Sequence, residues 1–264
     1  MMPSWATAIP PAIPRAALVT GGGRRLGRTI ALTLAEAGFD IALHCNASID
    51  DALATQAEIQ ALGRRAIILR GDLAQEAEVV PLIPQATAEL GPIGVLVNNA
   101  SAFERDDWHD ATRASWDRHI EPNLRAPFVL IQHFAHALPK GAEGVVINMI
   151  DMRVWSITPH FVSYTVSKFG LWALTQSMAL ALAPRIRVNG IGPGPALPNT
   201  RQTPEQFARQ AASVPLRRGP VIEEIGRAVM AILTLPSMTG QMIALDGGQH
   251  LQWSPGPAEP GDDE

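Results

Sequence analysis

Residues 18–38 have the sequence LVTGGGRRLGRTIALTLAEAG, which leaves an apolar run, turns on glycines and enters a helical pattern. A strand followed by a glycine-rich turn and a helix can bind the pyrophosphate of a dinucleotide. Gly21 and Gly27 allow close approach of the backbone, and the helix amino terminus offers free N–H groups and a positive dipole. An ordinary glycine-rich turn between a strand and a helix is the alternative.

Apolar, strand-like runs alternate with helical patterns on both sides of this stretch. The strand candidates are Ala16–Thr20, Asp40–His44, Ala66–Arg70, Ile93–Val97, Gly144–Met149, Arg187–Ile191 and Gln241–Leu245. The helix candidates span residues 25–37, 50–62, 75–90, 112–137, 161–183 and 221–235. This alternation predicts an α/β fold with a parallel sheet and right-handed crossovers. In that context, nucleotide binding becomes the favoured interpretation of the glycine-rich turn.

The sequence predicts one domain over residues 15–250, because no linker-like stretch divides them. Residues 1–14 contain Pro3, Pro10, Pro11 and Pro14, and residues 251–264 are rich in proline and end on acidic residues. Such segments bury too little apolar surface to offset the entropy lost on ordering. Both are therefore predicted to be disordered tails.

Composition narrows the class of protein. Of 264 residues, 47% are hydrophobic and 17% are charged, as in a globular chain, and the net charge of −4 argues against general nucleic-acid binding. No apolar run reaches the roughly 18–20 residues of a membrane span. The single cysteine, Cys45, excludes an intrachain disulfide, and no cluster has metal-ligand spacing. We therefore expect a cytoplasmic protein with a small-molecule substrate, no metal and no membrane partner.

The only tyrosine, Tyr164, lies four residues before Lys168, one of only two lysines. A helix places this pair on one face, and a cation beside a phenol lowers the phenol pKa from about 10. Tyr164 would then be a usable acid near neutral pH. Asp151 follows the strand candidate 144–149, where strand ends face the ligand crevice. A surface tyrosine and a solvated loop aspartate are the alternatives.

The second strand candidate ends in the uncharged sequence HCNAS, residues 44–48. An NAD site usually carries an acidic residue here to hold the ribose hydroxyls. A neutral end can accept a 2′-phosphate through Asn46 and Ser48, with charge added by Arg24 or Arg25. This pattern favours NADP over NAD, although these residues could instead cap the next helix.

Taken together, the motifs of residues 15–250 resemble the short-chain dehydrogenase/reductase family. They are TGGGRRLG (20–27), Asp72–Leu73, NNAS (98–101), Asn123, YTVSK (164–168), VNGIGPG (188–194) and TGQMIALDGG (239–248). The resemblance implies a Rossmann-like, doubly wound parallel sheet of seven strands and a nicotinamide cofactor. It also implies a homotetramer or a homodimer, of which we expect the homotetramer.

Within that family the chain is most similar to the pteridine reductases. Arg25 stands where the usual pattern has glycine, and Asp151 replaces the usual catalytic serine. The resemblance implies that Arg25 contacts cofactor and pterin, that Ser101 hydrogen-bonds near both, and that Phe103 covers one face of the pterin. The segment after Gly194, PALPNTRQTPEQF (residues 195–207), would shape substrate specificity, but it matches no known substrate loop.

The motifs and the resemblance together define a predicted site. The catalytic residues are Asn123, Asp151, Tyr164 and Lys168. The cofactor-binding residues are Gly21, Arg24, Arg25, Leu26, Gly27, His44, Asn46, Ala47, Ser48, Asp72, Leu73, Asn99, Ala100, Ser101, Met149, Tyr164, Lys168, Pro193 and Gly194. The substrate-binding residues are Arg25, Ser101, Phe103, Asp151 and Tyr164.

Three of these residues carry alternatives, and a fourth departs from the pattern of the pteridine reductases. Phe103 would stack on the pterin, or would only pack locally. Asn123 would hold a proton-relay water, or would only satisfy backbone groups. His44 is structural or lies beside the adenosine. Ala47 stands where the pteridine reductases carry an arginine that grips the 2′-phosphate. That loss weakens the NADPH expectation without reversing it.

The expected reaction is hydride transfer from NADPH to a C=N bond of a dihydropterin or dihydrofolate. Tyr164, with Asp151 or a water, would supply the proton, and Lys168 would bind the nicotinamide ribose. An ionised Asp151 would repel the oxyanion formed from a ketone, but it suits the N–H and amino donors of a pterin. The alternatives are a carbonyl or 3-oxoacyl-thioester reductase and a cofactor-sensing protein without catalysis.

Overall fold

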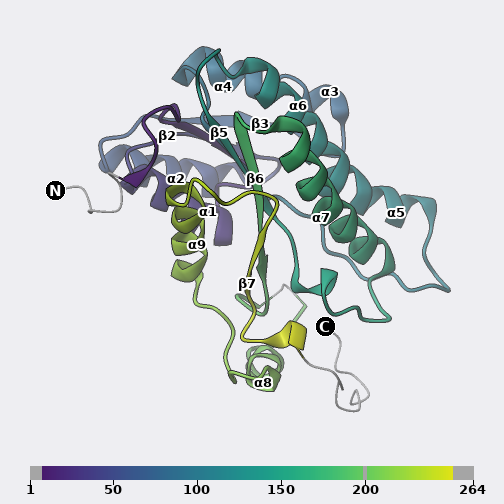
Figure 1. Ribbon diagram of the computed structural model, residues 1–264. Coiled ribbons are helices and arrows are strands. Elements are labelled where there is room, and N and C mark those ends of the chain that lie inside the picture. Colours follow the sequence, from purple (N-terminus) through teal and green to yellow (C-terminus); the bar gives the residue numbers. More distant parts are fainter. Residues whose placement is uncertain (1–7, 199–200, 252–264) are drawn as a thin grey trace.

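The protein is described by a computed structural model over residues 8–198 and 201–251. One parallel sheet of seven strands has the order β3-β2-β1-β4-β5-β6-β7 (Figure 1). The strands are β1 (Ala16–Val19), β2 (Asp40–Cys45), β3 (Ala66–Arg70), β4 (Val95–Asn98), β5 (Gly144–Met149), β6 (Ile186–Pro193) and β7 (Met242–Leu245). Val19 of β1 lies opposite Leu43 on one side and Val97 on the other. The predicted doubly wound sheet is confirmed, and its strand order reverses at β1 and β4.

Helices cover both faces of the sheet. They are α1 (Arg25–Glu36), α2 (Ile49–Ala61), α3 (Glu76–Val79), α4 (Leu82–Leu90), α5 (Arg113–Ile120), α6 (Ala126–Ala137), α7 (Val162–Leu182), α8 (Pro204–Ser213) and α9 (Ile222–Thr234), with the short turns η2 (Glu121–Arg125), η3 (Met152–Val154) and η4 (Gln249–Leu251). Val19 packs with Ile30 of α1 in one buried cluster. Leu18 and Leu96 pack with Phe134 of α6 in the other. Burial on both faces explains the continuous apolar runs of the strands.

Two predicted helices are interrupted, and prolines lie at or inside both interruptions. The helix expected over 75–90 is divided into α3 and α4, and Pro81 is the N-cap of the second. The helix expected over 112–137 consists of α5, the π-helical turn η2 and α6, with Pro122 inside η2. Proline lacks a backbone N–H and crowds the preceding turn, which disfavours a regular α-helix.

Helix α8 is not among the predicted helices, and it begins within the segment that matched no substrate loop. Its start signal is nevertheless present: Thr203 and Gln206 form a reciprocal capping box, and Pro204 occupies the first helical turn. In Figure 1, α8 lies beyond the β7 end of the sheet, apart from the two helical layers. This position places it next to the strand ends that build the site.

The predicted N-terminal tail is wrong for residues 8–14. Ile9 and Ile13 are only 2% and 1% exposed and belong to a hydrophobic cluster of the core. The backbone of Glu143 donates a 3.0 Å hydrogen bond to the carbonyl of Ala12. The apolar surface that the two isoleucines bury thus keeps this segment ordered despite the prolines around them. Residues 1–7 and 252–264 lie outside the described residues, so for them the tails stay predictions.

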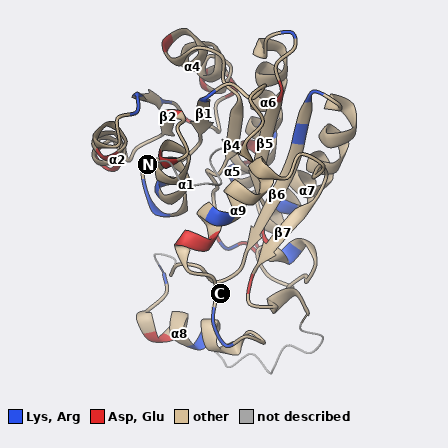
Figure 2. Ribbon diagram, turned by 60° about the vertical axis from the view of Figure 1, so that its left-hand side comes forward, with Lys and Arg blue, Asp and Glu red and all other residues tan. Residues whose placement is uncertain are grey.

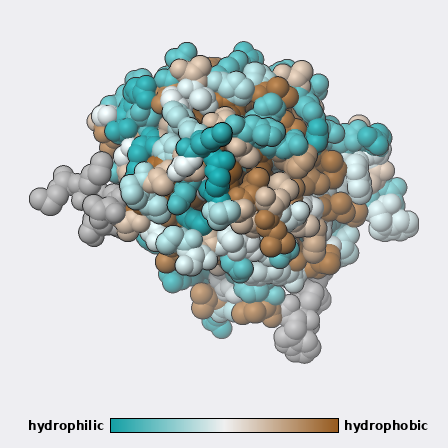
Figure 3. All heavy atoms as spheres, turned by 45° about the horizontal axis from the view of Figure 1, so that its top comes forward, coloured by the Kyte–Doolittle hydropathy of each residue, from teal (hydrophilic) through white to brown (hydrophobic). Residues whose placement is uncertain are grey.

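The surface is mixed in character. Basic and acidic residues are interspersed along the ribbon in Figure 2, and the face in Figure 3 mixes hydrophilic and hydrophobic residues. Within residues 8–198 and 201–251, no helix combines the length and the apolar character that a membrane crossing needs.

Candidate active site

The turn between β1 and α1 lets a ligand approach the backbone closely. Gly21 has a φ of +60°, and a Cβ on Gly27 would lie 2.0 Å from the carbonyl oxygen of Gly21. Arg24, at the N-cap of α1, makes no side-chain capping hydrogen bond, and the first turn holds no acidic residue. The first N–H groups of α1 therefore lack a side-chain cap, which fits the pyrophosphate of a dinucleotide.

The side chain of His44 is hydrogen-bonded to the backbone of this turn and of the segment after β3. Its Nδ1 accepts a 3.3 Å hydrogen bond from the N–H of Gly21, and its Nε2 lies 3.0 Å from the carbonyl oxygen of Gly71. Because an N–H only donates and a carbonyl only accepts, the ring is neutral with its proton on Nε2. Burial lowers the pKa of His44, which agrees with this tautomer. Both ring nitrogens serve the backbone, so the structure favours the structural role for His44.

The residues after β2 form the predicted 2′-phosphate region. Asn46 and Ala47 are exposed. Ser48 occupies the N-cap of α2 but makes no side-chain capping hydrogen bond. Ser48 is thus at the N-cap, as the alternative expected, but its side chain does not cap the helix. Beyond β3, Asp72 accepts a 3.0 Å hydrogen bond from the N–H of Ala74, and Leu73 is buried.

Asn99 joins the carboxyl ends of β1 and β4 at the point where strand order reverses. Its Nδ2 donates to the carbonyls of Thr20 and Gly21 at 2.8 and 3.2 Å. The N–H groups of Asn99 and Ala100 donate to Oγ1 of Thr20 at 2.9 and 3.0 Å. Thr20 is a site residue that the sequence analysis did not assign, and a polar residue at the end of an apolar strand is the signal for it.

Asp151, Tyr164 and Lys168 come together as predicted. The hydroxyl of Tyr164 donates to Oδ2 of Asp151 at 2.7 Å, and Oδ1 of Asp151 accepts from the N–H of Arg153 at 2.9 Å. Nζ of Lys168 donates to the carbonyl of Met149 at 2.9 Å and lies 5.7 Å from the Tyr164 ring centre. Tyr164 and Lys168 are 6% and 2% exposed. A surface tyrosine with a solvated lysine is therefore excluded.

The electrostatics of this group differ from the prediction. Burial raises the pKa of Tyr164, and the charge and hydrogen bond of Asp151 raise it further, to well above its ordinary value. Burial lowers the pKa of Lys168 to about 8. The predicted lowering of the Tyr164 pKa by Lys168 is thus wrong for this structure, because Asp151 lies against the hydroxyl itself. Tyr164 keeps its proton at neutral pH.

Asn123 lies in the π-helical turn η2 and is buried. Its Oδ1 accepts from the N–H of Ala102 at 2.8 Å. Its Nδ2 donates to the carbonyl of Ala102 at 3.0 Å and to Oγ of Ser167 at 3.1 Å. Both amide protons are thus used, and the structure favours the alternative in which Asn123 satisfies backbone groups.

A cavity of about 210 Å³ opens beside Tyr164. It is lined by Arg25, Phe103, Asp151, Met152, Arg153, Tyr164, Pro193, Gly194, Pro195, Leu197, Gln202, Gln210 and Gln249. Four of the five predicted substrate-binding residues are among them. The fifth, Ser101, is exposed, and its hydroxyl donates to the carbonyl of Ala102 at 3.2 Å. A larger cavity of about 580 Å³ lies between α1 and α9 and includes none of the predicted site residues.

Phe103 belongs to an aromatic cluster on the wall of this cavity. Its ring stacks on Phe161, with centres 4.7 Å apart and 7° between the planes, and meets the ring of Tyr164 edge-on at 4.7 Å. The guanidinium of Arg153 lies 4.9 Å from the Phe161 ring centre and 5.5 Å from that of Phe103. Neither Phe161 nor Arg153 is among the predicted site residues, although each lies within three residues of a predicted catalytic residue.

The segment after Gly194 forms another wall of the cavity. Arg25 has a φ of +51°, a backbone region that favours glycine, and its side chain donates to the carbonyl of Pro198 at 2.9 Å. Arg201 donates to the carbonyl of Phe103 at 3.0 Å, and Nε2 of Gln202 donates to Gln210 of α8 at 2.8 Å. The segment without a recognisable pattern is thus held against the phosphate turn and the aromatic cluster.

The family model described as short chain dehydrogenase matches residues 15–209, and the chain belongs to this family. Among solved structures, the chain is similar to FolM alternative dihydrofolate reductase 1 from Brucella canis, complexed with NADP. That protein is 47% identical with a TM-score of 0.89, over 94% of this chain and 98% of the other.

Two curated relatives are more distant. A short-chain dehydrogenase/reductase of Armillaria gallica is 33% identical over 89% of this chain and 95% of its own length. The 3-oxoacyl-[acyl-carrier-protein] reductase FabG of Staphylococcus epidermidis is 31% identical over 90% of this chain and 99% of its own.

Proposed function

We propose that this protein is an NADPH-dependent reductase that transfers a hydride to a C=N bond of a dihydropterin or dihydrofolate. The observation that carries the proposal is the carboxylate of Asp151, which lines the cavity and accepts a 2.7 Å hydrogen bond from the hydroxyl of Tyr164. The 47% identity to an alternative dihydrofolate reductase supports the same substrate class.

The residues at the strand ends fit a nicotinamide dinucleotide. Gly21, Gly27 and the uncapped start of α1 would hold the pyrophosphate, Ser48 would face the 2′-phosphate, and Lys168 would bind the nicotinamide ribose. When bound, NADPH supplies the hydride of the reaction. The NADP in the related FolM structure supports the choice of this cofactor.

Tyr164 holds the proton that the reduced substrate needs. Its raised pKa keeps the hydroxyl protonated and makes it a weak acid on its own. Transfer to a ring nitrogen leaves a phenolate beside the carboxylate of Asp151, and a nearby cation must offset that charge. Lys168, 5.7 Å from the ring centre and with its pKa lowered to about 8, carries such a charge at neutral pH.

Asp151 selects the kind of bond that can be reduced. An ionised carboxylate accepts hydrogen bonds from the N–H and amino groups of a pterin and thereby orients the flat ring. The same carboxylate would repel the oxyanion that develops when a ketone is reduced. Asp151 therefore favours C=N over C=O reduction.

Phe103 would complete the binding of a flat ring. Its ring stacks on Phe161, the guanidinium groups of Arg153 and Arg201 each lie 5.5 Å from its centre, and the residue also lines the cavity beside Tyr164. Aromatic contact favours an extended, planar substrate over a flexible aliphatic one. Arg25 would contact both cofactor and substrate, because it begins at the phosphate turn and lines the same cavity.

A 3-oxoacyl-thioester reductase is the second candidate, favoured by the 31% identity to FabG over 90% of the chain. The test follows NADPH oxidation by absorbance with 7,8-dihydropterins, dihydrofolate, an acetoacetyl thioester and a simple diketone. We expect turnover with the pterins, lost in Tyr164→Phe. Turnover of carbonyls alone would overturn the proposal.

Two controls sharpen this experiment. Asp151→Ser restores the hydroxyl usual in the family and should shift preference from pterins toward carbonyls. A wild-type protein that binds NADPH tightly but turns over no substrate would instead indicate the cofactor-sensing protein. The homotetramer and the cytoplasmic location expected from the sequence stay predictions, and sedimentation and cell fractionation test them.

A further inference from the structure

Three buried polar side chains lie behind the cavity wall, and the proposed chemistry uses none of them. Asp106 follows β4, His119 is on α5, and Ser163 is in the first turn of α7. Their exposed fractions are 3%, 0% and 0%. Burying such groups is unfavourable unless they are hydrogen-bonded, so their contacts define what they do.

These groups form a hydrogen-bond chain with one direction. The N–H of Glu104 donates to Nε2 of His119 at 2.9 Å, so the ring proton is on Nδ1. Nδ1 of His119 lies 2.6 Å from Oγ of Ser163, and that hydroxyl donates to Oδ2 of Asp106 at 2.5 Å. The chain therefore runs from Glu104 through His119 and Ser163 to the carboxylate of Asp106.

Further contacts fix the carboxylate of Asp106, and the His119 ring is neutral. Oδ1 of Asp106 accepts from the N–H of Ser163 at 3.1 Å, and Oδ2 also accepts from Oγ of Ser115 at 3.0 Å. Burial lowers the pKa of His119, which agrees with a neutral ring. The hydroxyl of Ser163 accepts a hydrogen bond from His119 and donates one to Asp106. In a serine nucleophile the hydroxyl would donate to the histidine, so these three residues are not arranged to activate Ser163.

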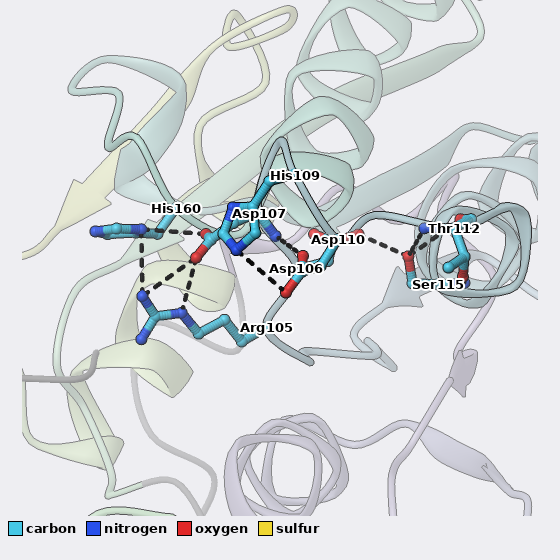
Figure 4. A network of polar contacts seen from close by, with 8 residues as sticks. All are labelled: Arg105, Asp106, Asp107, His109, Asp110, Thr112, Ser115 and His160. Atoms are coloured by element: carbon cyan, nitrogen blue, oxygen red, sulfur yellow. Dashed lines mark hydrogen bonds and ion pairs between the residues drawn. The ribbon is translucent and has the colours of Figure 1, made fainter.

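Asp107, the next residue, is also buried, at 8% exposed, but its carboxylate has a separate set of partners. Its Oδ1 lies 3.1 Å from Nδ1 of His160, and its Oδ2 accepts from Arg105 at 3.3 Å. Figure 4 shows Asp107 turned toward Arg105 and His160, with Ser115 on the other side of the loop. The two neighbouring aspartates are thus both buried but hold different partners, which makes Asp107 a matched control for Asp106.

We propose that Asp106, Ser163 and His119 are positioning residues that fix Phe103 against Tyr164 and thereby set how tightly a flat substrate is held. Glu104 directly follows Phe103, and Ser163 directly precedes Tyr164. The hydrogen-bond chain therefore links the residue after Phe103 to the residue before Tyr164. The rings of Phe103 and Tyr164 themselves meet edge-on at 4.7 Å. This inference rests on the proposed function for the identity of the flat substrate.

Asp106→Asn tests the direction of the chain without changing its shape. If Oδ1 of the asparagine accepts the N–H of Ser163, its amide must donate to the Ser163 hydroxyl. Ser163 then donates to Nδ1 of His119, which at 2.6 Å is much nearer than the other acceptor in reach, the carbonyl of Ser115 at 3.4 Å, and the ring proton moves to Nε2. That proton opposes the N–H of Glu104, so Glu104 and the preceding Phe103 must move away.

Two magnetic resonance signals report this change without any substrate. ¹⁵N-histidine spectra distinguish the two ring tautomers, and His119→Gln identifies the His119 signals among the seven histidines. Tyr164 is the only tyrosine, so ¹³C-tyrosine gives signals from one ring, which lies edge-on to Phe103 at 4.7 Å and to His119 at 5.9 Å. Its signal therefore depends on both neighbours, and Ser163→Ala, in which the His119 proton stays in place, separates the effect of Phe103 from that of the tautomer. We expect the tautomer change and a shifted Tyr164 signal in Asp106→Asn, and neither in Asp107→Asn.

The kinetic result follows from the same displacement. Asp106→Asn should raise the KM for the dihydropterin about tenfold while leaving the KM for NADPH unchanged, because small misplacements of a binding wall are costly. Asp107→Asn should leave both KM values unchanged. A tautomer change without a Tyr164 shift or a KM change would overturn the inference, as would equal effects of the two variants.

Two further outcomes are separated by design. If Asp106→Asn does not fold, Ser163→Ala tests the same link: it should shift the Tyr164 signal without moving the His119 proton, and an unshifted signal would overturn the inference. If the wild-type protein reduces no dihydropterin, the proposed function fails. The resonance signals then still decide whether the chain positions Phe103.

Discussion

Replacing Lys168 with methionine should change how the stability of the cofactor-free protein depends on pH. Burial lowers the pKa of Lys168 from 10.5 to about 8 in the folded state. Below about pH 8 the lysine is charged in both states, and the fold bears the cost of burying the charge. Between the two pKa values only the unfolded chain binds the proton, so raising the pH favours the folded state.

The magnitude follows from that shift. Each pH unit between the two pKa values contributes about 1.4 kcal/mol, so the wild-type protein should gain about 2 kcal/mol over Lys168→Met between about pH 7 and about pH 9.5. The hydrogen bond from Lys168 to Met149 adds an offset that changes little with pH. Comparing the two proteins at each pH cancels the titration of groups that do not interact with Lys168.

Urea unfolding of both proteins across this pH range measures the difference. Lys140, the only other lysine, is exposed, so Lys140→Met is a matched control whose difference from the wild type should stay flat. A flat difference for Lys168→Met as well would refute the reasoning. It would mean that the ammonium of Lys168 is as well solvated in the fold as in the unfolded chain.

Three further predictions follow from other parts of the structure. Gly27→Ala should abolish NADPH binding in a fluorescence titration, because its Cβ would lie 2.0 Å from the carbonyl oxygen of Gly21; retained binding would contradict the cradle. Ile13→Ala should lower the unfolding free energy by about 2–5 kcal/mol in urea, as for other buried isoleucines; no loss would place Ile13 outside the core. The tyrosinate absorbance of Tyr164 should appear only well above pH 10, since its pKa is raised, and should move to lower pH in Asp151→Asn; an unmoved transition would exclude Asp151 as a cause.

The sheet and the strand-end residues were predictable because their signals are local. Each strand is a short apolar run, and Asp151 and Asn99 follow such runs directly. The boundaries of long helices were less accurate, since prolines such as Pro81 interrupt a continuous helical pattern. The burial of Ile13 is not predicted for the converse reason. The prolines around it indicate a disordered tail, and a single apolar side chain is too weak a signal to indicate a core position.

Contacts between distant segments left no comparable signal. His119 meets Ser163 across 44 positions, and Asp106 meets Ser163 across 57. Each of these residues alone is typical of a solvated helix or loop. The direction of the Tyr164 pKa shift is unpredictable from sequence for a related reason. The spacing places Lys168 on the same helix face, but only the fold shows that Asp151 is in contact with the hydroxyl.

The contact between Arg25 and Pro198 connects two binding events. Arg25 begins in the phosphate turn, while the carbonyl that it holds belongs to the wall of the substrate cavity. A dinucleotide that orders the phosphate turn would, through Arg25, also order this wall. A substrate that orders the wall would in the same way order the phosphate turn. Thermodynamic reciprocity then requires each ligand to tighten the other by the same factor. Cofactor affinity measured without substrate would accordingly understate the affinity during turnover.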